Sequence, residues 1–264
     1  GYMSGWTFPY SSGIDLTSAA LSIAVGSPPG DLSPVCNRVS AERAFISIPG
    51  VIASLHGVDY ASTVPGVREI FLTKNIGDRV AFPVNNVQKC GNCISVTESR
   101  EEAVLAAEKA AAAIVVRLIP GDSSTAGFLF GTDYQWVPDA FTLTDRENIS
   151  ALSLLSAAPD KTAAGNTDHI SICGLPFPER EPGSNWQGRS FREALSMVEQ
   201  YGNVSFLPAK DWDRCDLGFI FWKSFLRGGL QGGLWIVDTI REMKKNGSQP
   251  EFSGAETITA GWRL

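Results

Sequence analysis

The sequence is poor in basic charge, cysteine and histidine. Its 264 residues include 22 Lys and Arg against 28 Asp and Glu, a formal net charge of −6, with five cysteines and two histidines. Binding to nucleic acid depends on clustered Lys and Arg that displace counterions, so this acidic balance argues against a nucleic-acid partner. The cysteines are too sparse for a disulfide scaffold and their number is odd, which indicates a reducing compartment, and we expect the cytoplasm.

A long uninterrupted apolar run is also lacking. The most apolar stretch, residues 219–237, contains Lys223, Arg227 and four glycines, so we expect no membrane span. The composition, 44% hydrophobic and 10% aromatic, is that of an ordinary globular protein. A chain of this length can bury a core of its own without disulfides or metals.

The first half of the chain alternates short strands with strong helix signals. Strands are predicted at 44–48, 51–55, 67–72, 79–84 and 94–96, with Pro49-Gly50 and residues 75–78 as turns. A helix is predicted over residues 15–25, and Ser99 with Glu102 forms a capping-box signature before an alanine-rich helix that ends at residue 113. Residues 114–118 then predict a buried strand, and residues 120–127 break the chain.

From about residue 131 the sequence becomes loop-rich and then helical. Residues 157–188 are predicted as long loops and residues 247–264 as a tail. Helices are predicted at 145–155, at 190–201 and, as one helix or two, at 217–245. These elements predict an α+β fold: an antiparallel sheet with flanking helices in a first domain, residues 1–130, followed by a mainly helical region, residues 131–264.

Four motifs suggest chemistry but are better explained by structure. The pair Cys90 and Cys93 lies between two predicted strands, which favours a hairpin turn, because a redox pair starts a helix and a structural zinc needs two further ligands. The run Gly228–Gly233 lacks the Lys-Ser or Lys-Thr of a phosphate loop and predicts close helix packing. The aromatic row at residues 219–225 predicts core or an interface. Ser123 with a histidine base would make a serine hydrolase, but the G-x-S-x-G elbow is absent.

An ordered series of short motifs spans the first 118 residues. The motifs are Gly13-Ile-Asp-Leu16, Pro49-Gly-Val-Ile52, Val64-Pro-Gly-Val67, Gly77-Asp-Arg-Val80 and Lys89-Cys-Gly91, followed by the helix after Ser99 and the strand Ile114–Arg117. In this order they resemble the C-terminal part of ATP-grasp ligases, in the branch of the L-amino-acid ligases and carboxylase-like relatives. The resemblance covers residues 1–118, and the remainder resembles no family.

The resemblance implies an ATP-dependent ligase that joins a small carboxylate to an amine through an acyl phosphate, with ATP and Mg²⁺ as cofactors. The nucleotide lysines, the glycine-rich loop and the Glu-x-Asn metal motif of that family are absent from this sequence. We therefore expect an upstream half, in the same enzyme or in a partner chain, to hold the nucleotide and the metal. We expect no cofactor or metal ligand here, assign no catalytic residue, and expect this chain alone not to turn over ATP.

The resemblance also implies a substrate-binding segment at the start of the sequence. By the spacing of the family, Gly1-Tyr2 matches the Gly-aromatic pair that borders the amino-acid pocket, and Gly5-Trp6 is the other candidate. The predicted substrate-binding residues are therefore Gly1, Tyr2, Gly5 and Trp6. The alternative is a non-catalytic binding module that retains only the ligase C-terminal architecture. The substrates and a homodimer are left open.

Overall fold

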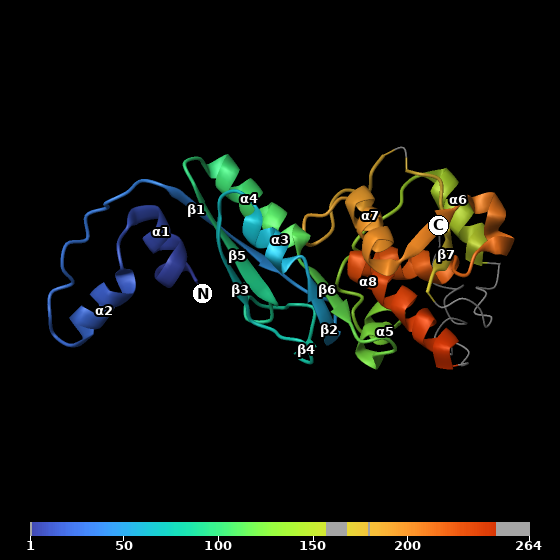
Figure 1. The fold of residues 1–264 in the computed structure, drawn as a ribbon, viewed down its shortest axis with the longest axis horizontal. Helices are drawn as coiled ribbons and strands as arrows, with labels where there is room; N and C mark the ends of the chain where they lie inside the picture. Colours follow the sequence, from blue (N-terminus) through green and yellow to red (C-terminus); the bar gives the residue numbers. More distant parts are fainter. Residues whose placement is uncertain (1, 157–167, 179, 247–264) are drawn as a thin grey trace. The chain divides into compact units, whose positions relative to one another are not determined.

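The structure is a computed structural model that describes residues 2–156, 168–178 and 180–246 (Figure 1). Contacts between residues divide the chain into two compact units. The first unit comprises the described residues up to Ile46, with Leu55–Asn75 and Pro83–Val115. The second unit comprises Ser47–Ser54, Ile76–Phe82 and the described residues from Val116 onward. The predicted domain boundary near residue 130 stays a prediction.

The first unit is built on a three-stranded antiparallel sheet in the order β1-β5-β3. The strands are β1 (Val39–Phe45), β5 (Gly91–Thr97) and β3 (Val67–Leu72). Two helices, α3 (Val58–Thr63) and α4 (Arg100–Ala113), pack on one face of this sheet. Helix α4 turns a row of small buried side chains to the strands: Ala103, Ala106, Ala107, Ala110 and Ala111. Small residues let the helix lie close to the sheet, and this layer is the core of the unit.

The same unit begins with a helical segment, η1 (Met3–Thr7), α1 (Phe8–Ser12) and α2 (Leu16–Ala24). Asp15 caps α2, because its carboxylate accepts a hydrogen bond from the Ser18 N–H at 3.0 Å, so the predicted helix at this position is confirmed. The segment η1–α1 contacts β1.

The second unit contains most of a sheet in the order β4-β2-β6, without the last two residues of β2 and the first of β6, and a separate pair of parallel strands, β7 and β8. Its strands are β4 (Arg79–Val80), β2 (Gly50–His56), β6 (Val115–Leu118), β7 (Ile170–Cys173) and β8 (Val204–Leu207). Its helices are α5 (Ser123–Phe130), α6 (Arg146–Ser156), α7 (Phe191–Gly202), η2 (Ala209–Arg214) and α8 (Phe219–Asn246). The Gln231 side chain on α8 is hydrogen-bonded to the segment just before β2: it accepts from the Ile48 N–H at 3.2 Å and donates to the Ser47 hydroxyl at 2.9 Å.

Helix α8 bends at its glycine-rich run. Gly229 has φ +60° and ψ −147°, a backbone conformation that is essentially restricted to glycine. The neighbouring glycines face packed atoms: a Cβ on Gly228 would meet Leu129 Cδ2 at 2.7 Å, and one on Gly232 would overlap the Ser224 carbonyl oxygen. The prediction of close packing is therefore confirmed. The aromatic row is core as predicted, with Phe221, Trp222 and Phe225 buried.

The predicted fold class is confirmed, because antiparallel sheets with flanking helices are followed by a mainly helical region. Several local predictions were wrong. The strand predicted at 44–48 ends at Phe45 and begins at Val39. The stretch expected to break the chain starts helix α5 at Ser123, and the predicted loops at 157–188 contain strand β7. The predicted tail, residues 247–264, lies outside the described residues.

Candidate functional site

The face of the β1-β5-β3 sheet opposite α4 gathers polar and aromatic side chains. In the strand register, Phe71 pairs with Asn92, while Glu69 and Glu42 both pair with Ile94. Residues directly opposite each other in antiparallel strands share a face, and alternate residues along a strand share it too. These five side chains therefore lie on one face, and Asn92 and Ile94 are completely buried at its centre.

The N-terminal helical segment lays aromatic rings on this face. The Tyr2 ring stacks on Phe71, with centroids 4.3 Å apart and planes 12° apart, and the Trp6 ring lies 5.0 Å from Phe71. The Tyr10 hydroxyl donates a 2.6 Å hydrogen bond to Glu69 Oε1. Burial raises the pKa of Tyr10 and this hydrogen bond raises it further, so Tyr10 stays a protonated donor at neutral pH.

The structure thus brings two of the predicted substrate-binding residues, Tyr2 and Trp6, into one aromatic cluster. Trp6 is 39% exposed, so part of this residue is accessible to solvent. Gly5 is exposed, and an added Cβ there would meet nothing within 4 Å. Gly1 lies outside the described residues. No contact tests a substrate-binding role, and all four assignments stay predictions.

Beside the rings lies a charged group that the sequence analysis missed. Lys89 Nζ is 3.3 Å from Glu42 Oε1 and 5.3 Å from the centroid of the Tyr2 ring. The Asn92 side-chain amide also donates to Glu42 Oε1. The Asn92 Oδ1 atom is buried and has no hydrogen-bond partner among the described residues. A buried acceptor without a partner costs about 1–3 kcal/mol. The group formed by Glu42, Lys89 and Asn92 therefore lacks one hydrogen-bond donor, the one that would pair with Asn92 Oδ1.

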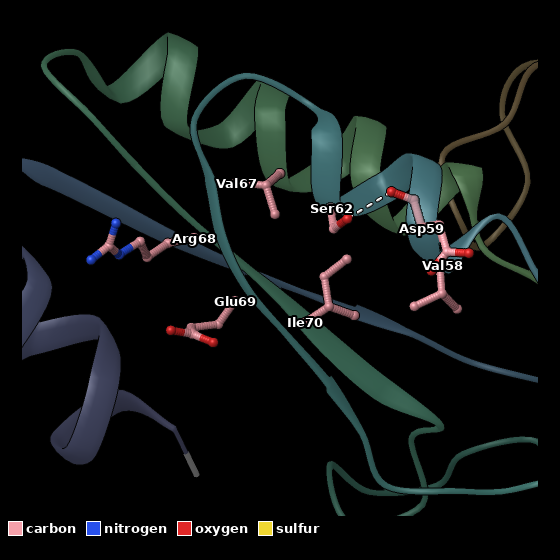
Figure 2. A pocket seen from close by; sticks show the side chains of 7 residues that line it. All are labelled: Val58, Asp59, Ser62, Val67, Arg68, Glu69 and Ile70. Atoms are coloured by element: carbon pink, nitrogen blue, oxygen red, sulfur yellow. Dashed lines mark hydrogen bonds between the residues drawn. The ribbon is translucent and has the colours of Figure 1, made fainter.

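A pocket of about 300 Å³ opens between α3 and the edge strand β3 (Figure 2). Its lining comes from both elements: Val58, Asp59, Ser62, Val67, Arg68, Glu69 and Ile70. The register of β3 shifts between Val67 and Glu69, and such a bulge re-aims neighbouring side chains. As a result Arg68 and Glu69 both extend on the side of the N-terminal helical segment, while Ile70 lies on the side of α3. Arg68 Cζ is 5.7 Å from the Tyr10 ring centroid.

The cysteine pair does not form the predicted hairpin turn. Cys93 lies within β5, Cys90 immediately precedes this strand, and both thiols are free and buried. Burial raises the pKa of each thiol to about 12, so at neutral pH neither is present as the thiolate that redox or metal chemistry needs. The turn prediction failed because it placed the strand three residues too late.

The serine and histidine candidates are also structural in context. Ser123 is the first residue of α5, and Asp122 caps that helix through the Ser124 and Thr125 N–H groups. His169 Nε2 lies 3.0 Å from the Ser205 hydroxyl. Among the described residues there is no group of three or more His, Cys, Asp or Glu that could hold a metal ion. No helix in the described ranges is long and apolar enough to cross a membrane, and the cytoplasmic location stays a prediction.

Lys223 on α8 is a partly buried lysine whose pKa is lowered. Burial lowers its pKa to about 8 from the ordinary 10.5. Between these values the unfolded chain binds more protons than the folded chain, so this group makes the free energy of unfolding rise with pH across that window. Lys223→Met is therefore expected to be more stable than the wild type at pH 7, with the gap narrowing as the pH rises from 8 to 10.5. Urea unfolding at several pH values measures this difference.

Lys245→Met is the matched control, because Lys245 is exposed on the same helix. Its gap to the wild type is expected to stay constant over the same range. A constant gap for Lys223→Met as well would show that the Lys223 ammonium is not held at a cost in the folded chain.

Comparison with known proteins gives a family-model match for part of the chain. Residues 44–118 match the family model of the L-amino acid ligase C-terminal domain 2. This confirms the resemblance to ATP-grasp ligases over that range. It includes Phe71, Lys89 and Asn92, and it excludes the N-terminal helical segment and Glu42. The comparison with curated proteins gave no match.

Two solved structures share part of the chain trace. One is phosphoribosylglycinamide synthetase from Anaerococcus prevotii, with 16% identity and a TM-score of 0.38 over 43% of this chain and 30% of that one. The other is an L-amino acid ligase from Bacillus licheniformis, with 15% identity and a TM-score of 0.38 over 45% of this chain and 30% of that one. In both cases the match spans 30% of the solved structure, a minor part of its length.

Proposed function

We propose that this chain is the C-terminal, substrate-side part of an ATP-dependent carboxylate–amine ligase. In the proposed reaction a carboxylate is activated as an acyl phosphate, and an amine attacks the acyl carbon and releases phosphate. The observation that carries the proposal is the match of residues 44–118 to an L-amino acid ligase domain. The aromatic cluster of Tyr2, Trp6 and Phe71 supports a substrate-side role, since it places aromatic rings beside the Lys89 ammonium group.

The described residues do not fit an ATP–Mg²⁺ site. They contain no cluster of three or more acidic, His or Cys side chains suited to a metal. The glycine-rich run that could suggest a phosphate loop is buried within α8. The proposal therefore assigns nucleotide and metal binding to a part of the ligase outside the described residues, and this chain to the shaping of the substrate side.

Helix α2 offers a surface for that nucleotide-binding part. Leu21 and Ile23 on α2 are 63% and 60% exposed, and Val25 directly after it is 78% exposed. Leu21 and Val25 are four residues apart and therefore lie on the same side of the helix. Exposed aliphatic side chains grouped in this way are typical of a face that another protein surface covers. We propose that the nucleotide-binding part of the ligase packs on this helix.

The experiment that tests the function is an ADP-release screen on the full-length protein with ATP, Mg²⁺ and pairs of amino acids. We expect ADP release that depends on both substrates, with a product of the mass of the amide detected by mass spectrometry. No release with any carboxylate–amine pair, from protein shown to be folded, would favour a non-catalytic binding module.

Tyr2→Ala is expected to change which amino acids that enzyme accepts. The substitution removes the ring that stacks on Phe71. The loss of one such contact changes the difference in activation free energy between competing substrates by about 1–3 kcal/mol, which is measured as the ratio of their kcat/KM values. Tyr2→Phe keeps the ring and is expected to keep the profile. Tyr60→Ala, at an exposed tyrosine on α3, is the control. A profile that Tyr2→Ala leaves unchanged would reject the pocket role.

A further inference from the structure

The ammonium group of Lys89 occupies a position that resembles a ligand-binding site. Its Nζ atom lies 3.3 Å from a Glu42 carboxylate oxygen and 5.3 Å from the centroid of the Tyr2 ring. A carboxylate combined with the face of an aromatic ring is an arrangement that attracts ammonium groups. The Lys89 side chain is only 15% exposed, so most of it is shielded from solvent.

Asn92 also contacts the Glu42 carboxylate, and one atom of its side chain lacks a hydrogen-bond donor. Its amide nitrogen donates to Glu42 Oε1, and a carboxylate can only accept, so the contact fixes which end of the amide faces Glu42. The other end, Oδ1, is buried without a partner, in a residue with no exposed surface. The missing partner is a hydrogen-bond donor to Asn92 Oδ1.

We propose that Glu42, Asn92 and Tyr2 form a binding site for the primary ammonium group of a ligand, and that Lys89 occupies only the Glu42 and Tyr2 side of this site when the ligand is absent. The ligand ammonium would donate to the Glu42 carboxylate and to Asn92 Oδ1, and it would face the Tyr2 ring. Because Lys89 has a long flexible side chain, its own ammonium can move to solvent, so the exchange replaces one positive charge by another.

The chemistry of the site selects against other ligands. The Glu42 carboxylate disfavours an anion. A primary ammonium carries three divergent donors, which suit a carboxylate and a separate amide oxygen better than the planar fork of a guanidinium does. That this ligand is the amine substrate rests on the proposed function, whereas the binding itself does not.

The test uses n-butylammonium as the probe and the full-length protein. Lys89→Met removes the internal ammonium and keeps a side chain of similar length. We expect Lys89→Met to bind n-butylammonium about tenfold or more tightly than the wild type, as measured by isothermal titration calorimetry. Adding Glu42→Gln to this variant is expected to abolish the gain.

Two controls isolate the cause. Lys109→Met removes an exposed lysine on α4 and is expected to leave the wild-type affinity unchanged. n-Butyltrimethylammonium keeps the charge and lacks N–H donors, so it is expected to bind Lys89→Met more weakly than n-butylammonium does, because it cannot supply the donor that Asn92 lacks.

Two results would overturn the site: Lys89→Met binding no more tightly than Lys109→Met, or both probes binding equally well. If Lys89→Met does not fold, Lys89→Gln replaces it. In the wild type, an unchanged Lys89 Cε resonance at high n-butylammonium concentration would by itself overturn the proposal. Ammonium binding without ADP release keeps the site and counts against the ligase, whereas ADP release without ammonium binding overturns the site alone.

Discussion

Gly232→Ala is expected to lower the free energy of unfolding of the second unit by about 3 kcal/mol, since overpacking of a close-packed core costs about this much. An added Cβ would overlap the carbonyl oxygen of Ser224 and approach Leu129 Cδ2 to 3.1 Å. Ser224 contributes backbone, which cannot move aside as the end of a flexible side chain can. Alanine favours a helix by about 1 kcal/mol over glycine, and this gain is too small to offset the overlap. Denaturant unfolding measures the change.

Gly127→Ala is the matched control. Gly127 also lies in a helix, α5, but a Cβ there would meet nothing within 4 Å. We expect this variant to be as stable as the wild type or more stable by up to about 1 kcal/mol. If Gly232→Ala matched it, the two halves of α8 could not be packed as closely as the structure describes.

The glycine run shows which part of a fold can be predicted from sequence. Small residues four apart indicated close packing, but their contacts, the Ser224 carbonyl and Leu129, depend on the bend at Gly229 and on the position of α5. Helices with local start signals were predicted well: Ser99 caps α4, and Ser190 with Glu193 forms a full capping box on α7. These signals act over three or four residues, so they can be recognised without knowing the rest of the fold.

Strands were harder to predict because their limits depend on distant partners. β1 begins at Val39, five residues before the predicted strand, since it pairs with β5 along its whole length, from Thr97 to Gly91. The helix α3 was missed because its six residues, which follow Gly57, carry no strong periodic signal.

Some residues of the candidate site were singled out from the sequence, and others were missed. The resemblance predicted the aromatic residues Tyr2 and Trp6, which the structure places on Phe71. Glu42 and Asn92 were missed because both lie outside the predicted strand limits, and their shared face follows only from the register of β1 against β5. Alternation along the correct strands, combined with this register, places both side chains on the face that Phe71 also occupies.

Arg117→Met is expected to lower the free energy of unfolding by about 3 kcal/mol, since breaking a largely buried ion pair leaves one charge inadequately compensated. Arg117 on β6 donates to both carboxylate oxygens of Asp238 on α8, through Nη2 to Oδ1 and through Nε to Oδ2 at 3.1 Å. Its Nη1 donates to the Tyr201 carbonyl at 2.8 Å. The side chains of Arg117 and Asp238 are only 18% and 14% exposed. After the substitution Asp238 keeps Arg241, at 3.2 Å, which holds the loss near the lower end of the range for buried pairs.

Arg192→Met is the matched control in the same unit. Arg192 pairs with Glu181 at 3.1 Å, but the two side chains are 65% and 40% exposed, and exposed pairs contribute about 1 kcal/mol or less. Denaturant unfolding of the two variants therefore compares the same chemical change in buried and in exposed surroundings. Equal losses would mean that the Arg117–Asp238 pair is as well hydrated as a surface pair. The position of α8 on β6 would then depend on their other contacts, among them the 3.3 Å hydrogen bond from Gln231 Nε2 to the Val116 carbonyl. A larger loss for Arg117→Met means that this ion pair fixes the position of α8 on the strand that ends the ligase-like segment.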